Sequence, residues 1–394
     1  MQVPSAQLSD VTNLATSTCQ QTPPPIKKHL PVLDGIRGLA ALMVMAFHYL
    51  EGKNYLIRGT FYEPLLKFSA LGQTGVDLFF VLSGFLITRI LINSKNKQNF
   101  FSIFYARRSI RIMPLYYFYL VLALIVLPIL AGEALPEFSK SWYSWVHLQN
   151  IPRTFQFPSE GPLFYWSLAV EEHFYLFWPV LVYFLPRRKI AIASLLLIAF
   201  SFGLRLYMLP QGWDVFYFTL TRMDALLFGA LLAVFEPALL TRTANNRRLF
   251  TLLFFSVGVP LGLIFLAAGG TGNYWVLAVK YPMTALVYTA LIGFAITTTD
   301  CSWVRKVFES RPLCFIGSIS YGLYVYHTLC FKWLNQLLPE TDPLLPMPLA
   351  FACAIAVAYV SFHLLEKPFL RLKRFFEYSK NDTSLNHPQP LKAT

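Results

Sequence analysis

Residues 75–87 read GVDLFFVLSGFLI and carry a single charged side chain, Asp77. They form the centre of an apolar run at 72–92, and a helix of about 20 such residues crosses the hydrocarbon core of a bilayer. Similar runs recur along the chain, and the predicted spans are 32–50, 72–92, 112–131, 166–185, 190–209, 222–240, 249–268, 281–299, 315–337 and 347–366. The sequence therefore predicts an all-α, polytopic membrane helix bundle of about ten transmembrane helices.

The composition excludes several classes of protein. Of the 394 residues, 56% are hydrophobic and 13% are charged, whereas a soluble domain has a charged share of roughly 25%. A disordered chain needs low hydrophobicity, and a soluble enzyme needs more charged residues to cover its surface. The formal charge of +13 is also found in nucleic-acid-binding proteins, but the distribution of the charges indicates a different partner.

Lys and Arg gather in short clusters between alternate predicted spans, while the intervening loops hold few cations. The clusters lie at 95–111, 187–189, 242–248, 305–311 and 367–374. This asymmetry is the positive-inside pattern, so we expect both termini in the cytoplasm, membrane lipids as partners and no nucleic-acid partner. We predict a mobile polar N-terminal tail at 1–31, a transmembrane domain at 32–376 and a polar cytoplasmic C-terminal tail at 377–394.

Arg37 and His48 lie eleven positions apart in the first predicted span. At about 100° per residue this spacing puts both side chains on one helix face, with a rise of about 16 Å between them. We expect one corridor along this face, in which Arg37 binds an anionic head group and His48 meets the reactive end of the ligand. A positive-inside arginine and a histidine bonded to a neighbouring helix explain the two residues equally well.

Glu171, Glu172 and His173 follow one another near the start of the fourth predicted span. The positive end of the helix dipole stabilises carboxylates there by about 0.3–1 kcal/mol. This effect explains why they are tolerated, but it does not explain why a histidine follows them. Successive helical residues point about 100° apart, so only one of the two glutamates can face a given cavity.

Arg108 and Arg111 lie three positions apart on the loop before the third predicted span and would share a helix face. Guanidinium groups bind phosphates well, although the positive-inside rule alone accounts for cations at this place. Asp77 and His327 are further ionisable residues inside predicted spans, and a structural role explains each at least as well as a chemical one. None of the five cysteines forms a CxxC pair, so we expect no metal.

Seven segments, in order, resemble those of the acyltransferase 3 family, integral membrane enzymes that O-acylate bacterial surface polysaccharides. The segments are 33–38 with His48, then 75–87, 107–114, 166–175, 222–229, 319–327 and 366–369. The resemblance extends over nearly the whole chain, from Leu33 to Arg374. It implies ten membrane helices, an acyl-CoA donor, commonly acetyl-CoA, and a sugar hydroxyl as the acceptor.

The resemblance also implies roles for particular residues. Arg37, Arg108 and Arg111 would hold the phosphates of acyl-CoA. His48 is our candidate for the general base that takes the proton of the acceptor hydroxyl. The other catalytic candidates are Arg37, Glu171 and Glu172, and one of the glutamates would orient His48 as a carboxylate does in catalytic triads. The candidates for acceptor contact are Asp77, Trp166, His173 and His327.

The expected reaction is transfer of an acyl group, acetyl above all, from acyl-CoA to a hydroxyl of a cell-surface or exported carbohydrate. The expected location is the bacterial inner membrane, which the protein crosses several times, and no particular oligomeric state is indicated. Buried His and Glu residues also suit a secondary transporter of a sugar or a proton-coupled solute. The chain shows no paired repeats of the kind common in transporters.

Overall fold

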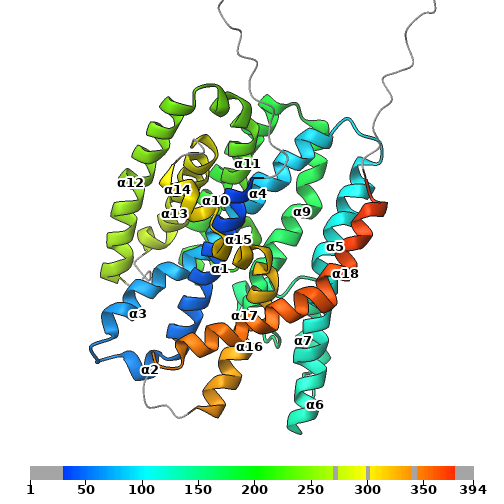
Figure 1. Ribbon diagram of the computed structural model, residues 1–394, viewed down its shortest axis with the longest axis vertical. Coiled ribbons are helices and arrows are strands. Elements are labelled where there is room, and N and C mark those ends of the chain that lie inside the picture. Colours follow the sequence, from blue (N-terminus) through cyan, green and yellow to red (C-terminus); the bar gives the residue numbers. More distant parts are fainter. Residues whose placement is uncertain (1–29, 269–273, 299–301, 339–343, 378–394) are drawn as a thin grey trace, which may run out of the picture.

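The computed structural model describes residues 30–268, 274–298, 302–338 and 344–377 (Figure 1). Within these ranges the regular structure is entirely helical, as the sequence predicted. The predicted tails at 1–31 and 377–394 lie outside the described residues, except for 30, 31 and 377, so the domain boundaries stay predictions.

Eight helical stretches of the described chain are long and apolar enough to cross a membrane. They are built on α1 (Pro31–Gly52), α4 (Gly75–Ser94), α5 (Phe100–Val121), α10 (Arg187–Met208), α11 (Thr219–Thr241), α12 (Thr243–Ala268), α13 (Tyr274–Thr297) and α17 (Met347–Ser361). A ninth span results if α15 (Arg311–Ser318) and α16 (Ser320–Leu337), which meet at 78°, are counted together. The protein is therefore a multi-pass membrane helix bundle.

The fourth predicted span, 166–185, coincides with α9 (Trp166–Phe184), which contains both glutamates and is not among these nine. With α9 included, each predicted span overlaps a helix or the bent pair. The remaining elements are short: α2 (Asn54–Ile57), α3 (Glu63–Ser69), η1 (Ala70–Thr74), η2 (Leu122–Val126), α6 (Leu127–Ala131), α7 (Phe138–Trp145), α8 (Asn150–Phe155), η3 (Leu163–Tyr165), η4 (Leu209–Gln211), α14 (Trp303–Phe308), η5 (Phe362–Glu366), α18 (Lys367–Arg371) and η6 (Leu372–Phe375).

The third span begins earlier than predicted. Helix α5 starts at Phe100, directly after Asn99, whose left-handed backbone (φ 57°) separates α5 from the preceding turn. Arg108 and Arg111 therefore lie inside a helix and not on the loop before it, which corrects the prediction. Arginine is a good helix former, and its long side chain can lie along apolar surface while the charged end reaches a polar site.

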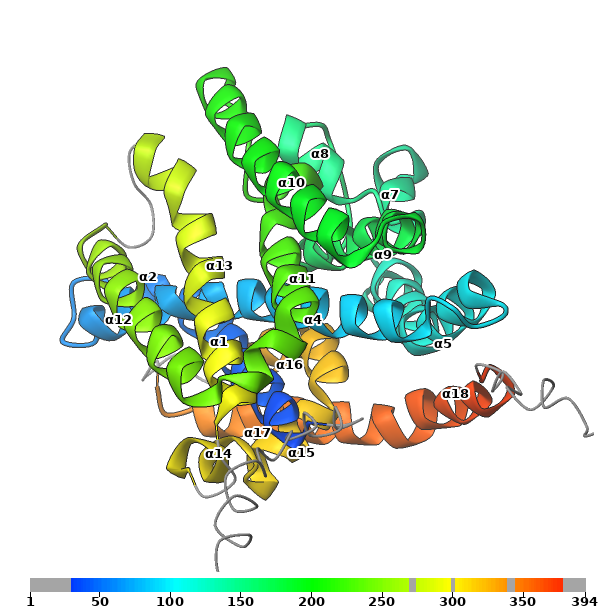
Figure 2. The same cartoon turned by 90° about the horizontal axis from the view of Figure 1, so that it is seen from above.

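Small residues bring the central helices close together. A Cβ added at Gly84 of α4 would lie 1.8 Å from the carbonyl oxygen of Leu226 in α11, and one at Gly229 of α11 would lie 2.0 Å from that of Val81. Helices in membranes associate through such close contacts. Seen from above, α1, α4, α11 and α16 lie between α9 and α10 on one side and α17 and α18 on the other (Figure 2).

Candidate active site

A cavity of about 990 Å³ is lined by residues of α1, α4, α5, α9, α16 and the segment after α18. Its walls carry six cations, Arg37, Lys97, Arg107, Arg108, Arg111 and Lys373, and two carboxylates, Glu171 and Glu377. We call it the basic cavity. The fold thus brings Arg37 of α1 to the same cavity as Arg108 and Arg111 of α5, as predicted. Such a set of cations favours an anionic ligand with several phosphates.

Neighbouring groups hold two of these arginines in place. Arg37 donates to Asp34 Oδ1 over 2.9 Å, one turn away on α1. The guanidinium carbon of Arg108 lies 5.5 Å from the ring centre of Tyr175 and 5.9 Å from that of Phe104. Cation–π contacts of this kind orient a guanidinium without neutralising it, so Arg108 keeps its charge available at the cavity wall.

Sequence reasoning missed three lining cations, Lys97, Arg107 and Lys373. All three belong to the clusters at 95–111 and 367–374, which the positive-inside rule already explained. The clusters are visible in the sequence, but their position does not distinguish a cation that sets the membrane topology from one that binds a ligand. Arg107 also donates to the carbonyl of Phe376 over 2.8 Å, which links the C-terminal segment to α5 at the cavity.

His48 lines a different cavity, of about 430 Å³. We call it the second cavity. Its other lining residues come from the end of α1, the segment after it and the end of α16: Tyr49, Gly52, Tyr55, Thr328, Phe331, Lys332, Asn335 and Gln336. Aromatic rings, amides and hydroxyls are suited to binding a polar, ring-shaped molecule such as a sugar.

A layer of buried side chains on α16 separates the two cavities. Tyr324 lines the basic cavity, and its ring centre lies 6.0 Å from that of His327. His327 has no exposed surface, and its Nε2 lies 3.0 Å from Nδ1 of His48. The predicted single corridor is therefore wrong. Helical periodicity places Arg37 and His48 correctly along α1, but α16 packs against this helix and fills the space between them.

The two adjacent glutamates differ, as the helical geometry predicted. Glu171 lines the basic cavity and accepts a hydrogen bond of 3.1 Å from the hydroxyl of Tyr175. Glu172 does not line either cavity, and its buried Oε1 has no hydrogen-bond partner among the described residues. Among the described residues, His48 bonds His327 and the backbone of Val44 and neither glutamate, so the predicted orientation of His48 by Glu171 or Glu172 is absent from this part of the structure.

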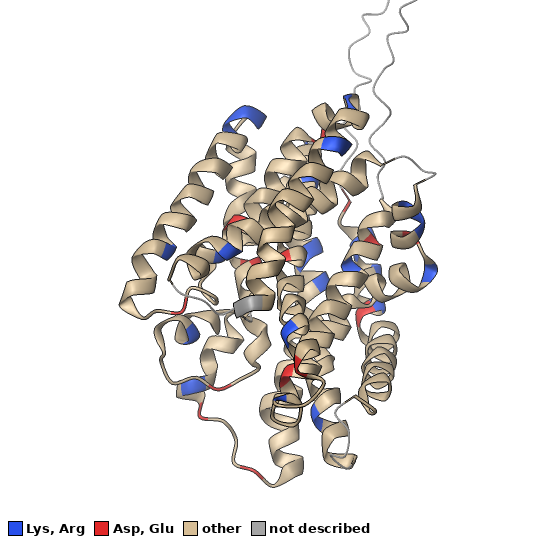
Figure 3. Ribbon diagram, turned by 90° about the vertical axis from the view of Figure 1, so that its left-hand side faces the viewer, with Lys and Arg blue, Asp and Glu red and all other residues tan. Residues whose placement is uncertain are grey.

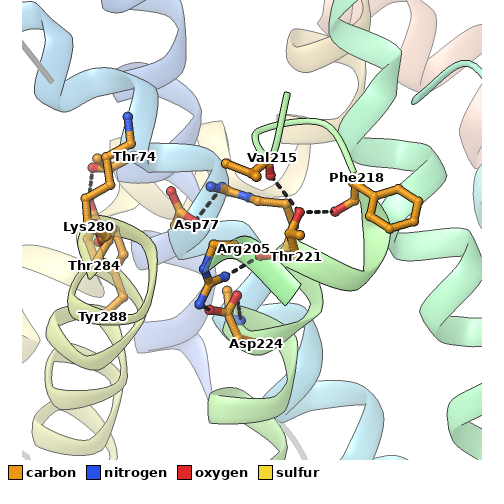
Figure 4. A network of polar contacts seen from close by, with 12 residues as sticks. Thr74, Asp77, Arg205, Val215, Phe218, Thr221, Asp224, Lys280, Thr284 and Tyr288 are labelled. Carbon is orange, nitrogen blue, oxygen red and sulfur yellow. Dashed lines mark hydrogen bonds and ion pairs between the residues drawn. The ribbon is translucent and has the colours of Figure 1, made fainter. Parts of the chain in front are cut away.

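Three predicted acceptor contacts lie away from both cavity linings. Asp77 pairs with Arg222 over 2.6 Å inside the bundle (Figure 4). Trp166 packs on the same guanidinium, with 5.6 Å between the Arg222 carbon and its ring centre. His173 Nδ1 lies 2.7 Å from the hydroxyl of Thr219. These contacts give each of the three side chains a structural role, and their contact with a substrate stays a prediction.

The ion pair of Asp77 belongs to a larger buried cluster. Arg205 pairs with Asp224 over 2.8 Å, and it also donates to the carbonyl of Thr221. Arg222 and Lys280 flank the ring of Tyr281 at 4.2 and 5.0 Å. Charged residues thus occur within the depth of the bundle as well as at its ends (Figure 3). Among the described residues, no group of three or more His, Cys, Asp or Glu is placed to hold a metal ion.

A family model described as "Acyltransferase domain" matches residues 30–363. The chain belongs to the acyltransferase 3 family. The family accounts for the order of the seven motif segments, and it agrees with the all-helical membrane architecture described above.

Curated relatives of this acyltransferase 3 protein include three named O-acetyltransferases. The Peptidoglycan O-acetyltransferase OatA of Listeria monocytogenes is 29% identical over 92% of this chain and 59% of its own length. The Putative peptidoglycan O-acetyltransferase YrhL of Bacillus subtilis is 28% identical (90% and 56%), and the O-acetyltransferase OatA of Staphylococcus aureus is 26% identical (88% and 58%). The chain thus spans less than two thirds of each relative. No solved structure matches it.

Proposed function

We propose that this protein transfers an acetyl group from acetyl-CoA to a hydroxyl of a cell-surface or exported carbohydrate, as a multi-pass protein of the bacterial inner membrane. The observation that carries the proposal is the pair of cavities on either side of His327: one is lined by six cations and the other by His48. The names of the relatives support acetyl as the transferred group and a carbohydrate as the acceptor.

The basic cavity suits the donor. CoA carries a diphosphate and a 3′-phosphate, and Arg37, Arg108 and Arg111 offer planar guanidinium groups that bind phosphate oxygens in pairs. The cavity is lined by cations from the clusters at 95–111 and 367–374, which the positive-inside rule assigns to the cytoplasm, where acyl-CoA is made. The pantetheine arm would extend towards Ser167 and Tyr324, whose hydroxyls are hydrogen-bonded to each other in the same cavity.

The second cavity suits the acceptor. It adjoins the opposite end of α1, and its amides from Asn335 and Gln336 can bind sugar hydroxyls. His48 would accept the proton of the attacking hydroxyl, whose oxygen then forms a bond to the thioester carbonyl carbon. As the C–S bond breaks, the CoA thiolate takes up the proton from His48. General-base assistance of this kind contributes about 10²–10⁴-fold in rate.

The donor and acceptor can meet only across the Tyr324–His327 layer. The cavities are separate in this structure, so the proposal includes a movement of the Tyr324 side chain that opens the layer beside His327 when both substrates are bound. A closed layer between reactions would also keep water on the acceptor side away from the thioester.

The test uses the full chain in lipid nanodiscs with acetyl-CoA carrying a ¹³C-labelled acetyl group and a panel of cell-wall glycans and other exported saccharides. Mass spectrometry should find CoA and a saccharide heavier by one labelled acetyl group. His48→Gln should lose the saccharide product, while the exposed control His363→Gln should keep it. If the wild-type protein releases no CoA with any acceptor but carries a sugar into proteoliposomes, the protein is a transporter and the proposal is wrong.

A further inference from the structure

The buried imidazole of His327 and the half-buried one of His48 form a chain of hydrogen bonds that ends at the second cavity. His327 Nδ1 lies 3.0 Å from the carbonyl oxygen of Leu323, one turn earlier on α16, and His327 Nε2 lies 3.0 Å from His48 Nδ1. The His48 ring also bonds the backbone carbonyl of Val44, one turn earlier on α1, the same relation that Nδ1 of His327 has to Leu323. When Nδ1 serves these two partners, Nε2 is the ring nitrogen left for a molecule in the cavity that His48 lines.

This chain determines where each proton sits when both rings are neutral. A carbonyl oxygen can only accept, so Nδ1 of His327 must carry its proton. The lone pair of His327 is then on Nε2, and it accepts from His48, whose proton must be on Nδ1. The lone pair of His48 is therefore on Nε2, at the cavity. A neutral histidine has two tautomers of similar energy, and only this one can take a proton from a molecule in the second cavity.

The same chain stabilises the charge that forms during the reaction. When His48 Nε2 takes up a proton, the ring becomes cationic, and its Nδ1–H already points at the lone pair of His327. His327 can share this proton because its own Nδ1–H remains bonded to the Leu323 carbonyl. In hydrolase triads a buried carboxylate holds the tautomer and supports the imidazolium. Here the side-chain partner of the ring is an imidazole, which costs less to bury in an apolar bundle than a carboxylate.

We propose that His327 is a positioning residue, which fixes His48 in the Nδ1-protonated tautomer and so directs the basic nitrogen of His48 into the second cavity. The inference rests on the proposed function for its catalytic consequence. The tautomer itself is a property of the resting protein and can be measured without any reaction. This role differs from the acceptor contact that the sequence suggested for His327, because the side chain is fully buried.

The test compares two variants of similar size. His327→Gln keeps an acceptor oxygen for the His48 Nδ1–H, whereas His327→Leu fills the same space with no acceptor. ¹⁵N NMR of histidine-labelled protein in nanodiscs reads the tautomer directly, and a His48→Gln sample identifies the His48 signals among the seven histidines of the chain. Wild type and His327→Gln should show His48 protonated on Nδ1, and His327→Leu should show a mixture of tautomers.

Kinetics supply the second readout. In His327→Leu, kcat should fall by about 10- to 100-fold, part of the contribution of a general base, while KM for acetyl-CoA should change by less than about twofold because the basic cavity is untouched. His327→Gln should recover most of kcat. The control is His363→Leu, whose Nδ1 lies 3.0 Å from the Tyr359 carbonyl but whose side chain is exposed, and its kcat should equal that of wild type.

The outcomes separate this inference from the proposed function. An unchanged His48 tautomer in His327→Leu overturns the inference, and so does a wild-type kcat in that variant. If the wild-type protein transfers no acetyl group while the tautomer responds to His327 as described, the proposed function fails and the positioning of His48 by His327 stands. Circular dichroism and thermal unfolding of each variant identify a loss of fold. If His327→Leu does not fold, the His48 tautomer and the kcat of His327→Gln test the inference, and both should be close to those of wild type.

Discussion

Asp77 on α4 and Arg222 on α11 form an ion pair of 2.6 Å, and neither side chain is more than 7% exposed. The guanidinium of Arg222 is also surrounded by aromatic rings, with the ring centre of Tyr281 at 4.2 Å and that of Phe216 at 5.2 Å. A charge buried in a membrane bundle is costly unless it is paired. The pair therefore acts as a junction between two central helices, and each member depends on the other.

Removing one member of this pair should destabilise the protein strongly. Asp77→Asn leaves the Arg222 charge buried without its counter-charge, and breaking a buried pair in this way costs about 3–5 kcal/mol. The measurement is thermal unfolding in detergent. The control is Lys67→Gln, which breaks an exposed pair with Glu63 at 3.2 Å and should cost at most about 1 kcal/mol. Equal effects of the two substitutions would contradict the junction role.

The close contact of α4 and α11 gives a second prediction. A Cβ at Gly84 would meet backbone atoms of Leu226, which cannot move as a flexible side chain can. Gly84→Ala should therefore force the helices apart and cost about 1–3 kcal/mol. Gly203 of α10 has nothing within 4 Å of an added Cβ, so Gly203→Ala should be neutral or stabilise α10 by up to about 1 kcal/mol. Equal melting temperatures for the two variants would show that the helices are not packed as described.

The cations of the basic cavity should determine the affinity for CoA. Arg108→Gln removes a charge at the cavity wall, and a hydrogen bond to a charged group contributes about 1.5–3 kcal/mol, so Kd for CoA should rise by roughly 10- to 100-fold. Calorimetric titration in nanodiscs measures it. The matched control is Arg188→Gln on α10, an exposed cation outside the cavity lining. The assignment of the cavity to CoA fails if both substitutions leave Kd unchanged.

His147, in the segment between α7 and α8, gives a pH-dependent prediction. Its ring is buried and stacked on Tyr116 at 4.1 Å, and burial lowers the pKa of His147 to about 4, with His173 acting in the same direction. The unfolded chain binds this proton below about pH 6.5 and the folded protein only near pH 4. The free energy of unfolding should therefore decrease as the pH is lowered from about 6.5 to about 4. His147 alone should account for a decrease of up to about 3 kcal/mol.

The variant His147→Asn tests this origin of the pH dependence. Asparagine tolerates the left-handed backbone at this position, where φ is 60°, and it does not titrate. Melting temperatures recorded from pH 7 to pH 4 should fall less steeply for the variant than for wild type. Parallel curves would show that His147 is not protonated on unfolding.

The sequence alone determined the local part of the candidate site. A helix of 3.6 residues per turn separates adjacent residues by about 100°, and this is why Glu171 faces the basic cavity while Glu172 does not. The cation motif was also predictable, since Arg37, Arg108 and Arg111 do line one cavity. Lys97 and Lys373 were not separable from cations that only set topology, because both kinds of cation occupy the same places beside the spans.

The chain's own residues fixed its class: long apolar runs must become membrane helices, because no other structure hides the backbone polar groups of such runs from lipid. Which helices touch, and what stands between Arg37 and His48, depended on packing between segments some 280 residues apart, as in the His48–His327 contact. Periodicity describes one helix at a time and carries no information about its neighbour. Only the tertiary structure could therefore place His327 between the two cavities. It also showed that Asp77, a predicted acceptor contact, pairs with Arg222.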